Sequence, residues 1–418
     1  MRKLPLTLAL AAFAFFEANA QHTRSLDTEN IKSVQTVCME DPLLAPVMDM
    51  DTWRVEIGFD EMSHEYKRYR YHIDHCEADW TVSDGIFESD YLAGMNDQLI
   101  EDYEKSFNTT QLYTHYSLSL PNSDVRLRLS GNYRVTIYDE DDDDKTPVAV
   151  SEFALLDSKM SVGVTSSADT DVDFQRTHQQ LSININYGAL RVVDPEREIK
   201  TLVIQNRRPD RRLWVEPNIR KANGVEFSHH KGLIFPAGNE YHKFELLDVH
   251  LVNMNVDNMR WYEPYFHATL YENTPSRNYV YDEDQNGAYV LRNSDDEDSE
   301  TTSEYAFVHF RLKTPRLTGG SVYVQGDWCN EWPSQDYEMT YDEEAGEYHL
   351  AVLLKLGYYN YCFLQAAENK DTGNFEGVSD LTDGNFFQTE NEYQVLVYYK
   401  EQGGRYDKLV GYAVVSNN

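Results

Sequence analysis

Residues 181–187 read Leu-Ser-Ile-Asn-Ile-Asn-Tyr, and residues 306–312 read Ala-Phe-Val-His-Phe-Arg-Leu. Apolar and polar side chains alternate strictly in both segments. Successive side chains of a β-strand point to opposite faces of a sheet, so this period of two predicts strands with one buried face. The two segments therefore indicate a β fold.

Further strand candidates recur along the chain, separated by Gly, Pro, Asn and Asp. One short helix is predicted over Gly94–Phe107, with one apolar face made of Leu99, Ile100, Tyr103 and Phe107. Short strands at this spacing predict an all-β chain of tandem β-sandwich domains, with that short helix in the first. The remaining strand candidates are residues 53–59, 69–73, 113–120, 133–138, 148–155, 200–205, 243–247, 265–271, 321–325, 349–354, 359–364, 393–399 and 410–415.

The first twenty residues have the pattern of a cleaved secretory signal peptide. Arg2 and Lys3 provide a basic start, residues 4–16 are almost entirely apolar, and Ala18-Asn19-Ala20 forms a small-residue cleavage site. No later apolar run approaches the ~20 residues of a membrane-spanning helix. We therefore expect an exported protein that is peripheral to the membrane and not inserted in it.

Two acidic runs suggest how the mature chain is divided. Asp139–Asp144 reads DEDDDD and is predicted to be a hairpin loop near the end of the first domain. Residues 293–303 read NSDDEDSETTS and are predicted to be a solvated linker or long loop, because like charges repel each other. The predicted domains are residues 25–157, 158–298 and 299–418.

The net charge is −34, so the chain should repel nucleic acid and anionic membrane surfaces. Basic partners and divalent cations remain compatible with this charge. Four cysteines, an even number in an exported chain, permit disulfides, with Cys329–Cys362 as the favoured pair, or four buried thiols. The cysteines are Cys38, Cys76, Cys329 and Cys362.

The sequence contains no nucleophile elbow, phosphate loop or zinc-ligand spacing, so we expect neither an enzyme nor a cofactor. Asp282, Asp284 and Asn286 match the start of a calcium loop, D-x-D-x-N-G. The twelfth position of such a loop should be Glu, whereas here it is Asn293. A polar β-turn is therefore the preferred interpretation, and a calcium-stabilised adhesin is a weaker hypothesis.

Trp328 and Trp332 lie in a Gly-x-Trp-x-x-x-Trp segment that precedes Gly357-Tyr-Tyr-Asn-Tyr361. By these residues the C-terminal domain resembles early-set immunoglobulin-like domains found beside glycogen-active enzymes and in starch-binding modules. Exposed Trp rings stack on sugars, which makes a glycan-binding protein the alternative function. The competing interpretation is that both rings fill the core of a sandwich.

The segment Arg68–Tyr133 contains a dense set of aromatic, His, Cys and Asn/Asp motifs. A second group of motifs lies near the C-terminus, namely Thr389–Tyr393, Val397–Tyr399 and Arg405–Tyr412. Together these motifs resemble the plug protein family of the bacterial type IX secretion system. The motifs of the first segment are His75–Trp80, Ser89–Asp97, Asp102–Thr110, Tyr113–Tyr116, Leu120–Asn122 and Ser130–Tyr133.

The resemblance implies a non-enzymatic periplasmic protein of Bacteroidetes-type bacteria, built from tandem immunoglobulin-like domains. It implies docking on the inner side of the outer membrane, against the SprA-type translocon barrel and possible associated subunits. There the protein would occlude the periplasmic opening when no substrate is in transit.

The signature residues have two interpretations, which the sequence leaves open. They could form a surface that contacts the partner, or they could be the packed core of the first sandwich. The residues concerned are Trp80, Tyr91, Asn96, Asp97, Phe107, Asn108, Tyr113, His115 and Tyr116.

Overall fold

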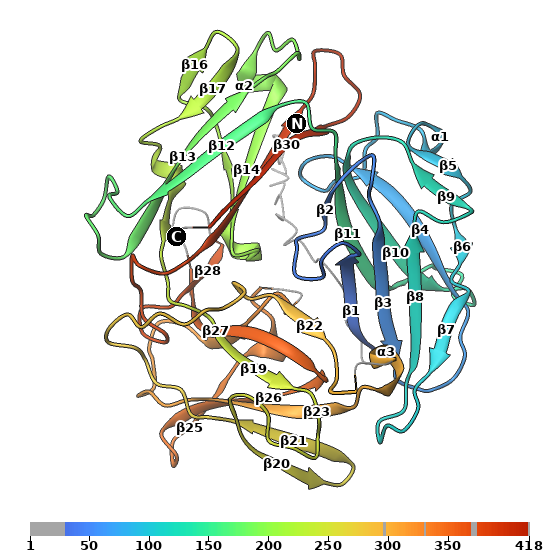
Figure 1. The fold of residues 1–418 in the computed structure, drawn as a ribbon, viewed down its shortest axis with the longest axis vertical. Helices are drawn as coiled ribbons and strands as arrows, with labels where there is room; N and C mark the ends of the chain where they lie inside the picture. The colour runs from blue at the N-terminus through green and yellow to red at the C-terminus, as the bar shows by residue number, and fades with distance from the viewer. Residues whose placement is uncertain (1–29, 296–297, 330–331, 369–373, 417–418) are drawn as a thin grey trace, which may run out of the picture.

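The computed structural model describes residues 30–295, 298–329, 332–368 and 374–416. The predicted signal peptide lies outside these residues. The described chain forms three β-sandwich lobes, which Figure 1 shows packed around a common centre. We define lobe A as residues 31–157, lobe B as residues 158–241 and 385–416, and lobe C as residues 242–384.

Lobe A is a sandwich of a four-stranded and a five-stranded sheet, in the orders β1-β3-β8-β7 and β2-β11-β10-β4-β6. Alternate residues of β3 and β10, such as Ile57, Phe59, Val135 and Ile137, are fully buried between the sheets. The acidic run Asp139–Asp144 connects β10 to β11, as predicted. The elements are β1 (Ile31–Cys38), β2 (Val47–Asp49), β3 (Val55–Glu61), β4 (Tyr69–Cys76), α1 (Glu88–Tyr91), β5 (Leu92–Gly94), β6 (Gln98–Leu99), β7 (Asp102–Lys105), β8 (Thr114–Leu120), β9 (Val125–Leu127), β10 (Gly131–Asp139) and β11 (Pro147–Leu156).

Lobe B combines an early and a late part of the chain. One sheet has the order β12-β13-β17-β16 with β18 beside β13, and the other has the order β15-β14-β29-β30. In Figure 1 the red C-terminal strand β30 lies among the green strands of this lobe. The elements are β12 (Ser161–Ser167), β13 (His178–Asn186), α2 (Pro195–Glu198), β14 (Ile199–Gln205), η1 (Pro209–Arg211), β15 (Arg212–Val215), β16 (Ile219–Lys221), β17 (Gly224–Phe227), η2 (Lys231–Leu233), β18 (Ile234–Pro236), β29 (Glu392–Tyr399) and β30 (Lys408–Ser416).

Lobe C is inserted between the two parts of lobe B. Its sheets have the orders β19-β27-β22, with β24 and β28 also on β27, and β20-β21-β23-β26-β25. Phe244, Val308, Phe310 and Phe363 are fully buried between them. The elements are β19 (His242–Leu246), β20 (Val256–Tyr262), β21 (Tyr265–Leu270), β22 (Tyr289–Leu291), α3 (Ser299–Thr302), β23 (Tyr305–Leu312), β24 (Val322–Gln325), η3 (Gln335–Tyr337), β25 (Thr340–Asp342), β26 (Glu347–Lys355), β27 (Gly357–Glu368) and β28 (Phe375–Val378).

The prediction of an all-β chain built from sandwiches is confirmed, and every strand candidate overlaps a strand. The lobes, however, do not follow the predicted order of domains. Sheets of lobes B and C combine strands from both sides of residue 298, as in the pairing of β14 with β29 and of β19 with β27. Local periodicity identifies strands but carries no information about which distant strand each one pairs with.

The predicted helix over Gly94–Phe107 is wrong. This segment begins at the last residue of β5 and contains β6 and β7, and these three strands pair with β9, β4 and β8. Gly94 has φ +120° and Asp97 has φ +58°, and neither angle belongs to an α-helix. Of the predicted apolar face, Ile100 is buried but Phe107 is exposed, so the helical spacing of these side chains is coincidental.

A chain that ends at residue 298 tests the interleaved arrangement. It lacks β29 and β30 of lobe B and β23, β26 and β27 of lobe C, so apolar residues of β14 and β19 lose their partner strands. We expect this shortened chain to bind a hydrophobic dye strongly and to show no cooperative melting for lobes B and C, unlike the full chain. A second cooperative transition, besides that of lobe A, would contradict the arrangement.

Candidate functional site

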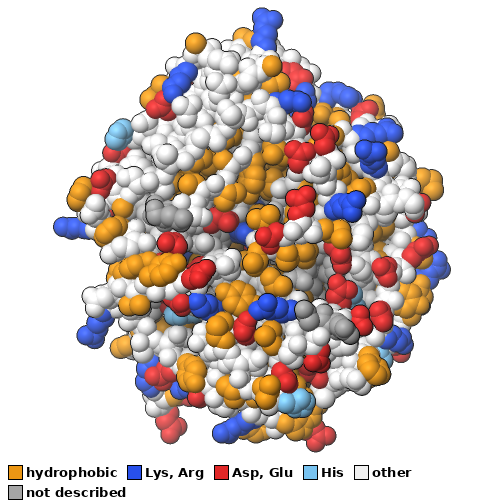
Figure 2. Space-filling view, in the orientation of Figure 1, with side chains coloured by type: hydrophobic (Ala, Val, Ile, Leu, Met, Phe, Trp, Pro, Cys, Tyr) orange, Lys and Arg blue, Asp and Glu red, His pale blue; other side chains and the backbone are white. Residues whose placement is uncertain are grey.

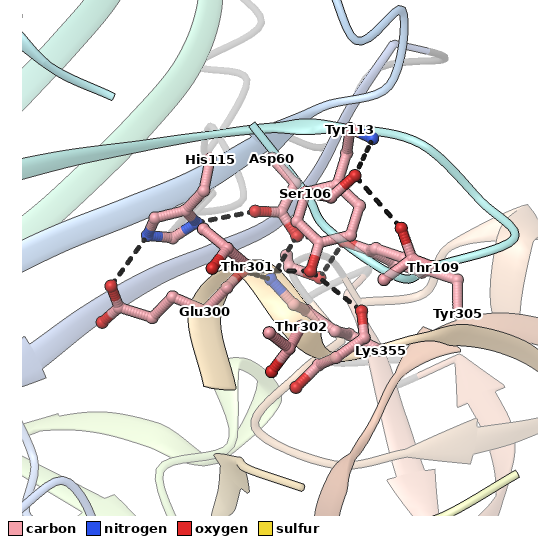
Figure 3. A network of polar contacts seen from close by, with 12 residues as sticks. Asp60, Ser106, Thr109, Tyr113, His115, Glu300, Thr301, Thr302, Tyr305 and Lys355 are labelled. Atoms are coloured by element: carbon pink, nitrogen blue, oxygen red, sulfur yellow. Dashed lines mark hydrogen bonds and ion pairs between the residues drawn. The ribbon is translucent and has the colours of Figure 1, made fainter. Parts of the chain in front are cut away.

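The junction between lobes A and C is built around a buried ion pair. Nζ of Lys355, at the end of β26, lies 2.7 Å from Oδ2 of Asp60 in β3, and both side chains are almost fully buried. Tyr305 donates its hydroxyl hydrogen to the same oxygen over 2.7 Å. Nδ1 of His115 lies 2.7 Å from the other oxygen, Oδ1. Figure 3 shows these four side chains converging from the two lobes. We call them the Asp60 cluster.

The Asp60 carboxylate is ionised because of these neighbours. Burial alone raises the pKa of a carboxyl group, but the Lys355 ammonium and the hydrogen bond from His115 outweigh burial and hold the pKa of Asp60 below its ordinary value. Lys355 also lies 4.3 Å from the centre of the Tyr113 ring and donates to the Glu300 carbonyl over 2.6 Å. The Asp60 carboxylate and the Lys355 ammonium therefore each have several polar or aromatic partners besides one another.

The loop that precedes β8 docks on the segment around α3. The Glu304 carboxylate accepts hydrogen bonds from the backbone N–H groups of Thr110 and Gln111 and from the Thr110 hydroxyl. The Phe107 N–H donates to the Thr301 carbonyl over 3.0 Å. Residues 293–303, predicted as a solvated linker, thus include buried contacts between lobes, since Thr301 is only 5% exposed.

The signature residues take different places in the structure. Tyr91 and Tyr116 are buried inside lobe A, where the Tyr116 hydroxyl donates to the Lys67 carbonyl. Tyr113 and His115 lie at the junction with lobe C, and the Tyr113 hydroxyl lies 2.9 Å from the Ser303 carbonyl oxygen. Phe107 is 66% exposed beside the same junction.

The remaining signature residues shape turns at the surface of lobe A. Asn96 binds both the N–H and the carbonyl of Ile73 and so extends the edge of β4. Trp80, Asp97 and Asn108 have left-handed backbone angles, with φ between +58° and +67°. The structure therefore distributes the signature among core, turns and junction and does not collect it into one exposed patch.

The second group of motifs meets the first at the junction between lobes A and B. Oδ2 of Asp407 accepts the Ala78 N–H over 3.0 Å and lies 2.7 Å from Nζ of Lys200. Oε2 of Glu77 accepts the Asp407 N–H and an N–H of Lys400, each over 3.1 Å. Motifs more than three hundred positions apart therefore bind each other directly.

Arg207, in the left-handed turn after β14, contacts all three lobes. It donates to the Leu43 carbonyl of lobe A, and it lies 3.4 Å from Glu392 of lobe B and 3.5 Å from Asp327 of lobe C. The side chain is only 7% exposed. Figure 2 shows acidic and basic side chains gathered near the middle of the face where the lobes meet.

Glu240 lies where the chain passes from lobe B into lobe C. Its carboxylate accepts the Tyr279 hydroxyl hydrogen over 2.5 Å and the Glu390 N–H over 3.2 Å. Burial raises the pKa of Glu240 to about 7, because no cation offsets the lost hydration among the contacts of this carboxylate that the structure describes. This junction therefore prefers a protonated Glu240.

The predicted glycan platform of Trp328 and Trp332 is not available. Trp328 is 6% exposed and stacks on Phe310, with ring centres 5.8 Å apart. Trp332 is 1% exposed and packs edge-on against Tyr323. Both rings fill the interior of lobe C, so neither can offer a face to a sugar.

In the candidate calcium loop, the carboxylates of Asp282 and Asp284 already bind hydrogen-bond donors of the protein itself. Lys243 lies 2.7 Å from Asp282, and Asp284 accepts the N–H groups of Tyr241 and Asn286. Burial raises the pKa of Asp284 to about 6, which weakens it as a metal ligand at mildly acidic pH. Within the described ranges, no group of three or more His, Cys, Asp or Glu side chains is arranged to hold a metal.

All four cysteines are buried free thiols, including the favoured pair Cys329 and Cys362. Burial raises the pKa of Cys76 to about 12, so this thiol stays protonated and unreactive.

Sequence reasoning did not find Asp60, Lys355 or Glu304. Asp60 and Lys355 are single charged residues in otherwise ordinary strands, and the sequence shows no motif around them. Only the three-dimensional pairing of lobes brings them together, so no local signal could have identified them.

Comparisons with known proteins agree with the division into lobes. Residues 31–157 match the family model described as the first domain of the type 9 secretion system plug protein, and these bounds coincide with lobe A. No curated protein matches the chain. A crystal structure of a hypothetical protein from Parabacteroides merdae ATCC 43184 is 34% identical, with a TM-score of 0.89, over 95% of this chain and 100% of that chain.

The Asp60 cluster predicts strong coupling between two charges. Lys355→Met leaves the Asp60 carboxylate buried without its cation, which we expect to lower the free energy of unfolding by about 3–5 kcal/mol at pH 7. The double variant Asp60→Asn/Lys355→Met removes both charges and should be more stable than Lys355→Met alone. Urea unfolding of the single and double variants measures this coupling.

The control is Arg316→Met, which breaks an exposed pair with Glu343. We expect this change to cost less than about 1 kcal/mol. Equal effects of Arg316→Met and Lys355→Met would show that the buried pair does not hold the junction.

Glu240 predicts a pH-dependent stability. The raised pKa means that the folded state binds this proton more tightly than the unfolded state. Its contribution is therefore fully present at pH 4, below the ordinary pKa of a glutamate, and is lost as pH rises through about 7. Glu240→Gln cannot ionise and should gain up to about 3 kcal/mol over the wild type at pH 8.5, with almost no gain at pH 4. Urea unfolding at both pH values checks this difference, and an equal effect at both would refute it.

Proposed function

Because the chain belongs to the type 9 secretion system plug protein family, we propose that it is a non-enzymatic periplasmic plug. It docks on the periplasmic opening of the outer-membrane translocon and occludes that opening when no substrate is in transit. The observation that carries the proposal is the match of lobe A to the first plug domain.

The architecture suits a function that depends on shape. A plug must be broad and must keep its outline when it is pressed against a pore. The three lobes are joined through buried polar contacts at the Asp60 cluster, at Asp407 and at Arg207. Such contacts have defined distances and directions, which favours one relative arrangement of the lobes.

The charge of the chain suits an exported protein with a specific protein partner. A net charge of −34 opposes contact with anionic lipid and nucleic acid and accelerates encounter with a basic surface. No helix in the described part of the chain has the length and apolar character needed to cross a membrane.

Deletion of the gene from a bacterium that uses this secretion system tests the proposed function. We expect the empty translocon to admit a large antibiotic that the intact outer membrane excludes, and we expect a plasmid-borne wild-type copy to restore resistance. A deletion strain without the translocon barrel is the control, because it should remain impermeable.

Affinity purification from solubilised outer membranes supplies the second measurement. The tagged protein should retain the translocon barrel, and the recovered amount should fall when secretion substrate is overproduced. Unchanged permeability in the deletion strain, together with absence of the barrel from the purified material, would rule out the plug role.

A further inference from the structure

A cavity of 230 Å³ lies beside the Asp60 cluster, between the outer face of β3 and β8 in lobe A and the segments around β22 and α3 in lobe C. Two smaller cavities of 120 Å³ and 70 Å³ share lining residues with it, among them Ser33 and Gln35 of β1. Together they form a groove that follows β1 along the boundary between the lobes. We call the largest of the three the β1 cavity.

The β1 cavity contains a hydrogen-bond acceptor without a donor. Nδ1 of His115 faces the ionised Asp60 carboxylate, so the ring hydrogen lies on Nδ1 and, in the neutral ring, Nε2 carries a lone pair. Nε2 is buried and has no hydrogen-bond partner among the described residues. Figure 3 shows this side of the ring pointing toward the Glu300 carboxylate, at 3.6 Å. A buried acceptor of this kind favours a ligand that donates.

Two carboxylates of the cavity have the same preference. Glu56 and Glu300 present carboxylates, which only accept hydrogen bonds when ionised. Two of the donors nearby are already used, since Lys355 binds Asp60 and the Glu300 carbonyl, and the Ser33 hydroxyl binds Tyr305. Gln35 and Ser299 also line the cavity, and these neutral side chains can both donate and accept. The cavity therefore offers acceptors and negative charge to a ligand.

The walls of the cavity suit an alkyl chain. Val37 and Pro42 of lobe A and Val290 and Leu291 of lobe C supply apolar surface. Arginine and lysine carry a charged head on an apolar stem, and they bury that stem against such surface. A cavity of 230 Å³ is large enough for one side chain of this kind.

We propose that the β1 cavity binds one arginine or lysine side chain of an extended segment of a partner protein. The head of the side chain lies between Glu56, Glu300 and Nε2 of His115, and the flanking residues of the partner lie in the smaller cavities along β1. The strong negative charge of the whole chain attracts such a segment. The inference does not depend on the plug role.

A labelled peptide with a single arginine tests the site on the full-length protein. The probe is fluorescein-Thr-Val-Arg-Val-Thr-amide, and its matched control has citrulline, which is neutral and of the same shape, in place of arginine. By fluorescence anisotropy at 0.15 M salt we expect the arginine peptide to bind at least about tenfold more tightly, as a charge-assisted hydrogen bond requires.

Three variant proteins test whether this preference arises in the β1 cavity. Glu56→Gln/Glu300→Gln should abolish it, whereas Asp102→Asn/Glu104→Gln on exposed β7 removes the same charge elsewhere on lobe A and should preserve it. Val290→Trp fills the cavity and should also abolish the preference, with circular dichroism melting as the check that the protein remains folded.

Three outcomes would overturn the proposal. Equal binding of the two peptides would show that no cation is selected. Equal loss in the β7 control would show that the attraction is a general effect of charge. Displacement measurements in which spermidine binds through Glu56 and Glu300 while the peptide does not bind would assign the cavity to a free polyamine.

Discussion

The ion pair between Asp60 and Lys355 joins residues 295 positions apart in the sequence. Removing two charges from water costs free energy. The attraction between the charges offsets that cost only when their remaining hydrogen-bond donors and acceptors also have partners. Tyr305, His115 and the Glu300 carbonyl satisfy them here. Because these bonds are directional, the junction accepts one orientation of lobe C against lobe A, which a purely apolar contact would specify less strictly.

The insertion of lobe C makes that orientation matter for the whole chain. The segments that enter and leave lobe C run side by side, since the Phe386 N–H donates to the Gly238 carbonyl and the Asn391 side chain donates to the Ala237 carbonyl. Lobe C is connected to lobe B by these two chain segments and to lobe A by the Asp60 cluster. A rotation of lobe C relative to the other lobes would therefore break buried polar contacts. Arg207 adds a contact with all three lobes at the centre.

The strands were predictable because each one carries its own evidence. A period of two, as in residues 306–312, reports one buried face whatever the strand pairs with. Partner choice was not predictable, and the boundary expected at residue 298 therefore fell between strands that share a sheet. The helix expected over Gly94–Phe107 failed for a related reason: apolar residues at helical spacing also occur in short edge strands, where the backbone angles of Gly94 and Asp97 decide the structure.

The candidate site was harder to predict than the fold. Tyr113 and His115 were singled out from the sequence, but their partners Asp60 and Lys355 were not. The core interpretation of Trp328 and Trp332 prevailed over the sugar platform because aromatic partners cover both rings. Buried single charges leave no pattern in a sequence, since their meaning depends on a partner from another lobe.

The position of the signature motifs bears on how a plug could work. His75–Trp80 binds the Arg405–Tyr412 block, and the loop before Tyr113–Tyr116 binds the segment around α3. These motifs thus act chiefly within the molecule, where they fix the lobes relative to one another. For a protein proposed to act by occlusion, the relative placement of the lobes determines the outline that meets the pore. Residues that fix this outline would serve the function even without touching the translocon.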